Sequence, residues 1–241
     1  MAILWETLGE GLSLATETDF RFGTDAVILS HFARPRKSGE TVCELGTGCG
    51  VIPFLLLQKP FVPRQVLGVD IQEKAIDLCH LSAEKNSRKE VSFLCADWRE
   101  PANIATRGSF DRVVCNPPYF PTDSGRQNDA PARRIARHEQ ADTLSSLCNA
   151  ATYLLKYGGR FCVCHRPERL CDLVCALREH GLEPKRIQLV SQRQDAAPFL
   201  LLVDAVKGGK AGVEILQPLY LDKEAVVAEV YGAYRTGDTN E

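Results

Sequence analysis

The chain has 241 residues, of which 44% are hydrophobic and 25% are charged. This length and composition fit one globular domain, and they exclude a small disulfide scaffold and an intrinsically disordered chain. The 29 Lys and Arg residues and 31 Asp and Glu residues give a net charge of −2, so no strong overall positive charge marks a nucleic-acid-binding protein. We expect residues 1–241 to form a single domain.

The sequence predicts neither a membrane segment nor a secretion signal. The longest nearly uncharged apolar run, Val51–Gln58, is far shorter than the roughly 20 residues that cross a bilayer. The amino terminus carries Glu6 and Glu10 and lacks the basic-then-apolar pattern of a signal peptide. The ten cysteines are scattered through apolar segments, as reduced cysteines are. These features predict a cytoplasmic protein that does not bind a membrane.

One group of cysteines could form a metal site. Cys162 and Cys164 share one face of a predicted strand, Cys171 and Cys175 share one face of a predicted helix, and His165 lies between the two pairs. Because the group contains no C-x-x-C pair, we expect these side chains to pack in the core, and we predict no metal.

The predicted secondary structure is that of an α/β protein. The first 40 residues form an extension with one predicted helix, Asp25–Ala33, and Thr24 as its N-cap. From residue 41 onward, short β-branched runs alternate with amphipathic stretches, which indicates βα units around a mostly parallel sheet. Seven strands are predicted, over Thr41–Leu45, Gln65–Asp70, Val91–Ala96, Arg112–Cys115, Arg160–His165, Lys185–Ser191 and Pro198–Val206.

Glycine and proline mark the ends of the predicted helices. A helix over Gln72–Ser87 places its apolar residues on one face. Thr143–Tyr157 is expected to end in a left-handed cap at the glycine pair that begins with Gly158. Pro167 and Gly181 bracket a further helix, the first within its opening turn and the second just beyond its end.

Four other segments complete the predicted organisation. Gln192–Ala197 joins the last two strands of the sheet and is too short for a parallel crossover, so these strands should be antiparallel. Phe120–Gln140 is a polar insertion, longer than an ordinary connection and therefore expected to be functional or mobile. Beyond the sheet, we predict a strand over Val213–Leu216 and a helix over Lys223–Tyr231.

A glycine-rich turn follows the first strand of the sheet. Glu44 is followed by Gly46, Gly48 and Gly50, which allow a sharp turn and a close approach of the backbone to a ligand. Asp70 ends the next strand, where its carboxylate can accept hydrogen bonds from the two hydroxyls of a ribose. The spacing is G-x-G-x-G and not G-x-G-x-x-G. Together these residues indicate a nucleoside-bearing cofactor, but they do not distinguish a dinucleotide from another cofactor that contains a nucleoside.

Asp97 and Trp98 directly follow the third strand, at the same carboxyl edge of the predicted sheet. The Asp97 carboxylate can accept a hydrogen bond from an adenine amine. Trp98 has two interpretations, packing on that ring or packing in the core. Ile71, next to Asp70, is assigned to the same expected cofactor site.

The sequence Asn116-Pro117-Pro118-Tyr119 follows the fourth strand directly. Two prolines exclude a helix and fix an extended turn. Asn116 offers a side-chain carbonyl, the backbone of Asn116 or Pro117 offers a second acceptor, and Tyr119 offers an aromatic face. This set fits a planar amine such as that of adenine, whose nitrogen is a poor nucleophile until two acceptors hold its N–H bonds. Asn116 has no pKa near neutrality, so its role would be alignment and polarisation rather than base catalysis.

The order of these motifs resembles a known enzyme family. Glu44–Gly50, Asp70, Asp97 and Asn116–Tyr119 are similar to the motifs of the class I S-adenosylmethionine-dependent methyltransferases that act on amino groups. In addition, Phe20–Val27 resembles the opening motif of the bacterial valine-tRNA adenine-N(6)-methyltransferase family, which modifies the adenosine following the anticodon. The resemblance implies a Rossmann-like fold with a seven-stranded, mostly parallel sheet, an antiparallel last strand and helices on both faces.

The same resemblance implies a cofactor, a substrate and a set of site residues. The cofactor is S-adenosylmethionine, the partner is tRNA, and the reaction methylates the 6-amino group of an adenine. The expected catalytic residues are Asn116, Pro117 and Tyr119. The residues expected to bind the cofactor are Glu44, Gly46, Gly48, Gly50, Asp70, Ile71, Asp97, Trp98 and Asn116.

Basic residues suggest where RNA would bind. The stretch from Arg126 to Arg137 contains four arginines and one aspartate, which gives it a local charge of +3. The other interpretation of this segment is a solvated loop. The residues expected to contact RNA are Tyr119 and Phe120, which would stack on a base, together with Arg126, Arg133, Arg134, Arg137, Lys207 and Lys210.

Three other functions compete with this hypothesis. N-P-P-Y also occurs in methyltransferases that act on glutamine side chains of release factors, but that family usually carries a helical domain before its core, and only 40 residues precede Thr41 here. A non-catalytic RNA-binding module and a dehydrogenase would share parts of the pattern.

Overall fold

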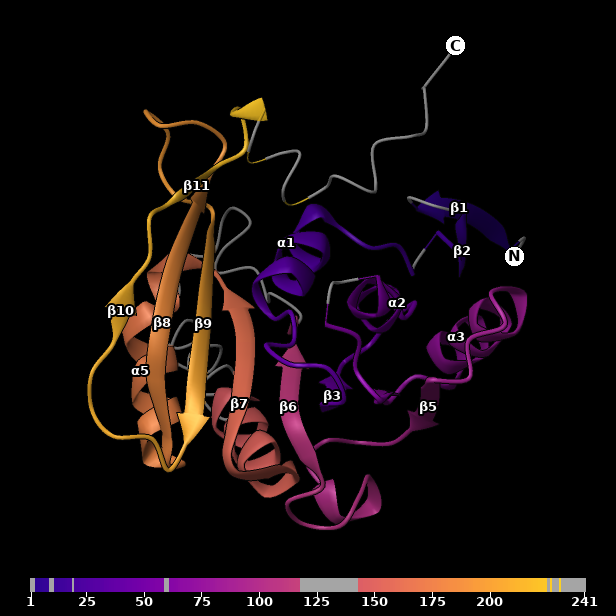
Figure 1. Cartoon of the computed structure of the whole chain (residues 1–241), viewed down its shortest axis with the longest axis horizontal. Helices are drawn as coiled ribbons and strands as arrows, with labels where there is room; N and C mark the ends of the chain where they lie inside the picture. Colours follow the sequence, from indigo (N-terminus) through magenta and orange to yellow (C-terminus); the bar gives the residue numbers. More distant parts are fainter. Residues whose placement is uncertain are drawn as a thin grey trace, which may run out of the picture.

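A computed structural model describes residues 3–8, 11–18, 20–58, 61–117, 143–224, 226 and 230 of the chain. Within these residues, the core is a sheet of nine strands with helices on both of its faces (Figure 1). The α/β class and the Rossmann-like arrangement predicted from the sequence are confirmed. No helix in this part of the chain is long and apolar enough to cross a membrane.

The strand order of the sheet is β10-β8-β9-β7-β6-β3-β4-β5, with β11 beside β8. Strands β3 to β7 pair in parallel, whereas β9 is antiparallel to both β7 and β8, as predicted. The bounds are β3 Thr41–Leu45, β4 Gln65–Asp70, β5 Val91–Cys95, β6 Phe110–Cys115, β7 Leu155–His165, β8 Leu182–Ser191, β9 Leu200–Lys207, β10 Glu214–Ile215 and β11 Leu219–Tyr220.

The register of the central strands determines where their ends meet. Leu45, the last residue of β3, lies opposite Val69 of β4 and Cys115 of β6. The residues that follow these positions, Gly46, Asp70 and Asn116, therefore come out at one edge of the sheet. This is the carboxyl edge, where open α/β sheets bind their ligands.

Helices cover the two faces of the sheet, and each face buries its own apolar cluster. On one face lie α1 (Thr24–Phe32), α2 (Val51–Leu57) and α3 (Glu73–Lys85), with Phe54 and Ile52 almost fully buried. On the other lie a helix of residues 143–154 and α5 (Leu170–Glu179), as Figure 1 shows. The short helices η1 (Pro101–Asn103) and η2 (Pro167–Arg169) lie in connections. Burial of these clusters drives the folding of the domain.

Two strands that the sequence analysis did not predict precede α1. The hairpin β1 (Leu4–Leu8) and β2 (Leu12–Thr16) is antiparallel, and β2 packs on α3. Asn86 fixes this contact, because its side chain accepts a hydrogen bond from the Ser13 backbone N–H at 2.9 Å and donates one to the Ser13 carbonyl. The extension before β3 therefore contains a hairpin packed on α3 in addition to the predicted helix.

Two predicted helix ends were wrong. Gly23, not Thr24, is the N-cap of α1, and Thr24 is the first helical residue. The helix of residues 143–154 ends before Gly158, which adopts a positive φ of 77° inside β7. There the register between β6 and β7 shifts, so the glycine serves the strand rather than the helix. Gly181, with φ 73°, follows α5 as predicted.

The remaining predictions concern the ends of the sheet and the insertion. The sheet has two short strands more than the predicted seven, β10 within the predicted Val213–Leu216 and β11 beyond it. Residues 224, 226 and 230, within the predicted helix Lys223–Tyr231, are helical. The predicted insertion Phe120–Gln140 lies outside the described residues.

Candidate active site at the carboxyl edge of the sheet

The loop between β3 and α2 turns sharply through three glycines. Gly46, Gly48 and Gly50 have φ values of 74°, 54° and 80°, a region that other residues rarely adopt. At Gly50, a Cβ atom would also lie 2.9 Å from the sulfur of Cys79, which is too close. The predicted need for glycine in this turn therefore has a conformational cause at all three positions and a steric one at Gly50.

The loop is tied to β4 by backbone and side-chain hydrogen bonds. The N–H groups of Gly46 and Thr47 donate to the Val69 carbonyl at 2.8 and 2.9 Å. One oxygen of the Asp70 carboxylate accepts the Gly48 N–H at 2.9 Å, and the other accepts the Gln72 N–H at 3.0 Å. Each carboxylate oxygen can accept a second hydrogen bond. Asp70 thus orders the loop and keeps the capacity to accept hydroxyl groups.

Glu44 lies beneath this loop and is buried. Its carboxyl accepts a hydrogen bond from the Thr47 hydroxyl at 2.5 Å. Burial raises the pKa of Glu44 well above its usual range, the Thr47 hydrogen bond opposes that effect, and the charge of Asp70 adds to it. The hydrogen bond from Thr47 ties the loop to the buried Glu44 side chain.

Asp97, Trp98 and Ile71 lie at the same edge, around the end of β5. The Asp97 carboxylate accepts hydrogen bonds from the Arg99 side chain and backbone, and the side-chain bonds lower its pKa most, so it stays ionised. Trp98 is half-buried against the apolar cluster, with its ring beside Gly46. Ile71 is 59% exposed, which leaves an apolar side chain accessible next to Asp70.

Asn116 follows β6 directly and is half-buried, with a buried Pro117 after it. The thiol of Cys164 donates a hydrogen bond to the side-chain carbonyl of Asn116 at 3.0 Å. The prediction that Cys164 packs in the core is confirmed but incomplete, because it does not include this contact. Because Cys115 pairs with Val163, Asn116 and Cys164 are the next neighbours in register, so aligning the two parallel strands would have found it.

Some predicted site residues lie away from this edge, and others lie outside the described residues. Lys207 and Lys210, which are expected to contact RNA, lie at the opposite edge of the sheet from Asn116, since β9 is antiparallel to β7. There the Lys207 ammonium donates to the carbonyls of Thr152 and Leu155, both at 2.7 Å. Lys207 thus caps the helix of residues 143–154. The predicted residues Pro118, Tyr119, Phe120, Arg126, Arg133, Arg134 and Arg137 lie outside the described residues.

The expectation that all four cysteines pack in the core is correct for one pair and wrong for the other. Cys162 and Cys164 are buried in the sheet, whereas Cys171 and Cys175 are exposed on α5. Within the part of the chain that the structure describes, no group of three or more His, Cys, Asp or Glu side chains is arranged to hold a metal ion.

Comparison with known families identifies the kind of protein. The profile described as methyltransferase domain matches residues 36–196, which include the glycine loop, Asp70, Asp97 and Asn116. The chain belongs to the methyltransferase domain family.

Curated relatives of this chain are named as methyltransferases. A protein of Bacteroides fragilis named tRNA1(Val) (adenine(37)-N6)-methyltransferase is 28% identical over 84% of this chain and 86% of its own length. A protein of Shewanella frigidimarina with the same name is 27% identical over 70% of this chain and 68% of its own length.

Solved structures share the fold at low sequence identity. A protein of Agrobacterium tumefaciens described as a predicted O-methyltransferase superposes with a TM-score of 0.70 at 17% identity, covering 88% of this chain and 97% of its own. TrmN from Thermus thermophilus superposes with a TM-score of 0.57 at 20% identity, covering 76% of this chain and 48% of its own. These similarities confirm the fold of the methyltransferase family.

Proposed function

We propose that the protein transfers a methyl group from S-adenosylmethionine to the 6-amino group of adenine 37, which follows the anticodon, in a valine tRNA. The observation that carries this proposal is the juxtaposition of Asn116 with the glycine loop and Asp70 at one edge of the sheet. The names of the related proteins, which match most of the chain, supply the substrate. A tRNA substrate would also make the cytoplasm the site of action.

The residues at this edge fit the proposed cofactor. The glycine turn brings backbone close to the ligand, and the remaining acceptor capacity of Asp70 suits the two ribose hydroxyls. Ile71 and Trp98 offer apolar surface for the adenine ring, and Asp97 offers an ionised acceptor for its amine. When bound, S-adenosylmethionine supplies a methyl group on a sulfonium.

Asn116 is proposed to hold the target amine. Its side-chain carbonyl accepts one N–H of the adenine, and a backbone carbonyl of the proline turn accepts the other. These two contacts favour a tetrahedral, nucleophilic nitrogen as positive charge develops on it, and the proton then leaves to solvent. Asn116 has no suitable pKa to act as a base. The catalytic roles of Pro117 and of Tyr119, which would stack on the extruded adenine, belong to the same proposal.

The segment after the proline turn is proposed to bind the tRNA backbone. Arg126, Arg133, Arg134 and Arg137 follow the turn in sequence and carry the local positive charge noted above. Phe120 would extend the stacking surface of Tyr119. Lys207 and Lys210 are not part of this proposed surface, because their strand ends at the opposite edge.

The alternative, methylation of a glutamine in a release factor, is not favoured by the names of the related proteins. One experiment separates the two. The protein is incubated with methyl-labelled S-adenosylmethionine and either bulk tRNA or release factor, and the products are digested to nucleosides or amino acids. We expect label in N6-methyladenosine from the tRNA reaction. Label found only in glutamine would contradict the proposal.

A further inference from the structure

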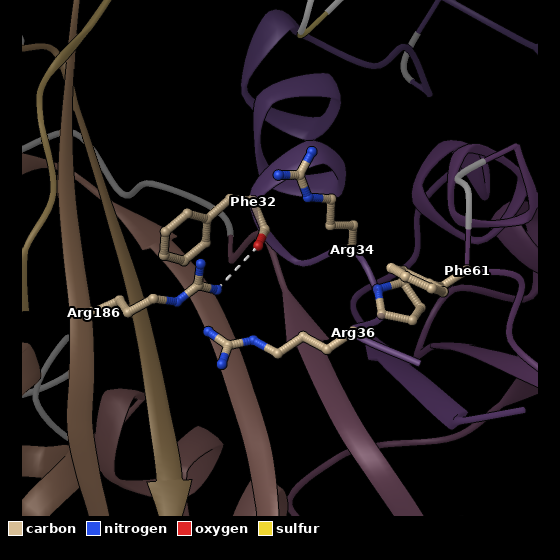
Figure 2. A pocket seen from close by; sticks show the side chains of 6 residues that line it. Phe32, Arg34, Arg36, Phe61 and Arg186 are labelled. Carbon is tan, nitrogen blue, oxygen red and sulfur yellow. Dashed lines mark hydrogen bonds between the residues drawn. The ribbon is translucent and has the colours of Figure 1, made fainter. Parts of the chain in front are cut away.

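A pocket rich in arginine lies on the α1 face of the sheet, below the carboxyl end of that helix (Figure 2). We call it the arginine pocket, and its lining residues are Phe32, Arg34, Pro35, Arg36, Phe61 and Arg186. Its volume is about 310 Å³. Arg186 and its partner Asp204 pair at mid-strand in β8 and β9, so the pocket is distinct from the edge that carries the proposed methyl-transfer site.

Positive charge exceeds negative charge around this pocket. Asp204 is fully buried and accepts hydrogen bonds from Arg160 and Arg186 at 2.9 and 2.8 Å. The guanidinium of Arg36 lies 3.9 Å from the same carboxylate. One carboxylate therefore faces three guanidinium groups, and it is already hydrogen-bonded by two of them. A chain with a net charge of −2 has concentrated cations here.

The neighbouring carboxylate does not correct this imbalance. Glu40 is buried and is bound by Arg112, whose Nε donates to it at 3.1 Å. Its other oxygen accepts the backbone N–H of Arg36 at 3.1 Å. Glu40 is thus committed to Arg112 and to the loop backbone. Among the described residues, Arg36, Arg112, Arg160 and Arg186 therefore share two carboxylates, and this local excess of positive charge favours an anionic ligand.

The two central guanidinium groups of the pocket repel each other. Figure 2 shows those of Arg36 and Arg186 pointing toward each other below the Phe32 ring. Burial, followed by the charges of Arg160 and Arg186, lowers the pKa of Arg36. Like charges that converge in this way are stabilised when an anion with several oxygens binds between them, as phosphate does with arginine.

The aromatic residues of the pocket indicate which class of anion it would bind. The Arg186 guanidinium stacks on the Phe32 ring at 4.7 Å and is held by the Phe32 carbonyl at 3.4 Å, so its donors are oriented. Phe61 forms the other side of the pocket and is 46% exposed. An exposed ring beside an anion site suits a phosphate that carries a flat, stackable group.

We propose that the arginine pocket binds the phosphate group of a nucleotide, with Arg36 and Arg186 on the phosphate oxygens and Phe61 against the attached base. Two sources share this chemistry. The nucleotide belongs either to the tRNA, in which case the pocket is a second anchor and rests on the proposed function, or to a free mononucleotide.

The test uses the full chain, with S-adenosylhomocysteine present in excess so that AMP does not occupy the adenosine site of the cofactor. Binding of AMP and of inorganic phosphate is measured by calorimetry for the wild type, Arg36→Gln and Phe61→Ala. The control is Arg178→Gln, which removes an arginine, 63% exposed, from α5 on the other face of the sheet. Arg36 is half-exposed, and Asp204 keeps two partners without it, so Arg36→Gln is expected to fold.

We expect Arg36→Gln to weaken AMP binding at least tenfold and the control to leave it unchanged. Phe61→Ala should weaken AMP binding more than phosphate binding. A tRNA-binding arm then separates the sources: a loss of tRNA affinity in Arg36→Gln, with a salt slope smaller by about one, identifies an RNA nucleotide, and an unchanged tRNA affinity identifies a free one.

Two results would overturn the proposal. One is equal AMP affinity in the wild type, Arg36→Gln and Arg178→Gln. The other is a wild type that does not bind AMP together with unchanged tRNA affinity in Arg36→Gln. Failure of the proposed function looks different, because the protein would then not methylate tRNA although its AMP binding still depended on Arg36.

Discussion

At the scale of single residues, Asn116 and Asp70 are expected to divide chemistry from cofactor binding. Asn116→Ala removes an acceptor that acts as charge develops on the target nitrogen, so kcat should fall by orders of magnitude while the Kd for cofactor stays nearly unchanged. Asp70→Ala removes an acceptor for the ribose and the hydrogen bonds to Gly48 and Gln72, so cofactor affinity should fall most. Calorimetry and single-turnover kinetics measure both. Equal losses of cofactor affinity would contradict this division.

Cys164 is expected to act as a positioning residue for Asn116. Its buried thiol donates to the side-chain carbonyl that the proposed mechanism uses. Cys164→Val keeps the apolar volume and removes the donor, so kcat should fall about tenfold, or ~1.4 kcal/mol in the barrier, with KM little changed. Cys164→Ser keeps a donor and should restore most of kcat. If the two variants lose kcat equally while melting like the wild type, the thiol serves only packing.

At the scale of elements, one carboxylate joins the starts of three strands. Asp111 of β6 accepts the backbone N–H and hydroxyl of Thr41, the first residue of β3, at 2.9 and 2.8 Å. It also accepts the ammonium of Lys156 in β7 at 2.9 Å. Partial burial raises the pKa of Asp111, but these hydrogen bonds outweigh it and lower the pKa to about 2.

This shift gives a pH-dependent contribution to stability. Because the folded pKa lies below the ordinary value of 3.8, the contribution is complete above about pH 4 and is lost as the pH falls toward about 2. Asp111→Asn should therefore unfold at lower urea concentration at pH 6, and its stability should fall less steeply than that of the wild type between pH 4 and pH 2. Lys156→Met serves as a partial control, because it removes one donor to the Asp111 carboxylate and leaves the two from Thr41. Parallel pH curves for Asp111→Asn and the wild type would show that the carboxylate is not coupled to folding.

The success of the strand predictions and the failure of some others have physical causes. Strands β3 and β4 match their predictions at both ends, because a buried parallel strand is a continuous apolar run bounded by polar residues. The β1–β2 hairpin was missed because its stability depends on α3, a contact distant in sequence. The same reason hid the contact between Cys164 and Asn116. Local patterns locate motifs, whereas contacts between strands need the sheet order.

At the scale of the whole molecule, the described basic residues include lysines at the amino edge of the sheet and the arginines of the arginine pocket. Lys207 donates to helix carbonyls at the amino edge, and the backbone of Lys210 accepts a hydrogen bond from Lys185 there. The arginine pocket lies on a face between the edges. The positive charge is thus distributed unevenly in a chain with a net charge of −2, and the position of tRNA can be tested by removing charge from one place at a time.

The last prediction concerns which edge faces the tRNA. Replacing Arg133 and Arg134 by Gln should weaken tRNA binding and reduce the slope of log Kd against log salt by about two, because two phosphate contacts are lost. Lys210→Gln is the matched control, an exposed cation at the amino edge, and should change neither quantity. Filter binding at four salt concentrations, with S-adenosylhomocysteine present, measures both. A reduced slope for Lys210→Gln with an unchanged slope for the arginine pair would move the tRNA to the opposite edge, away from Asn116.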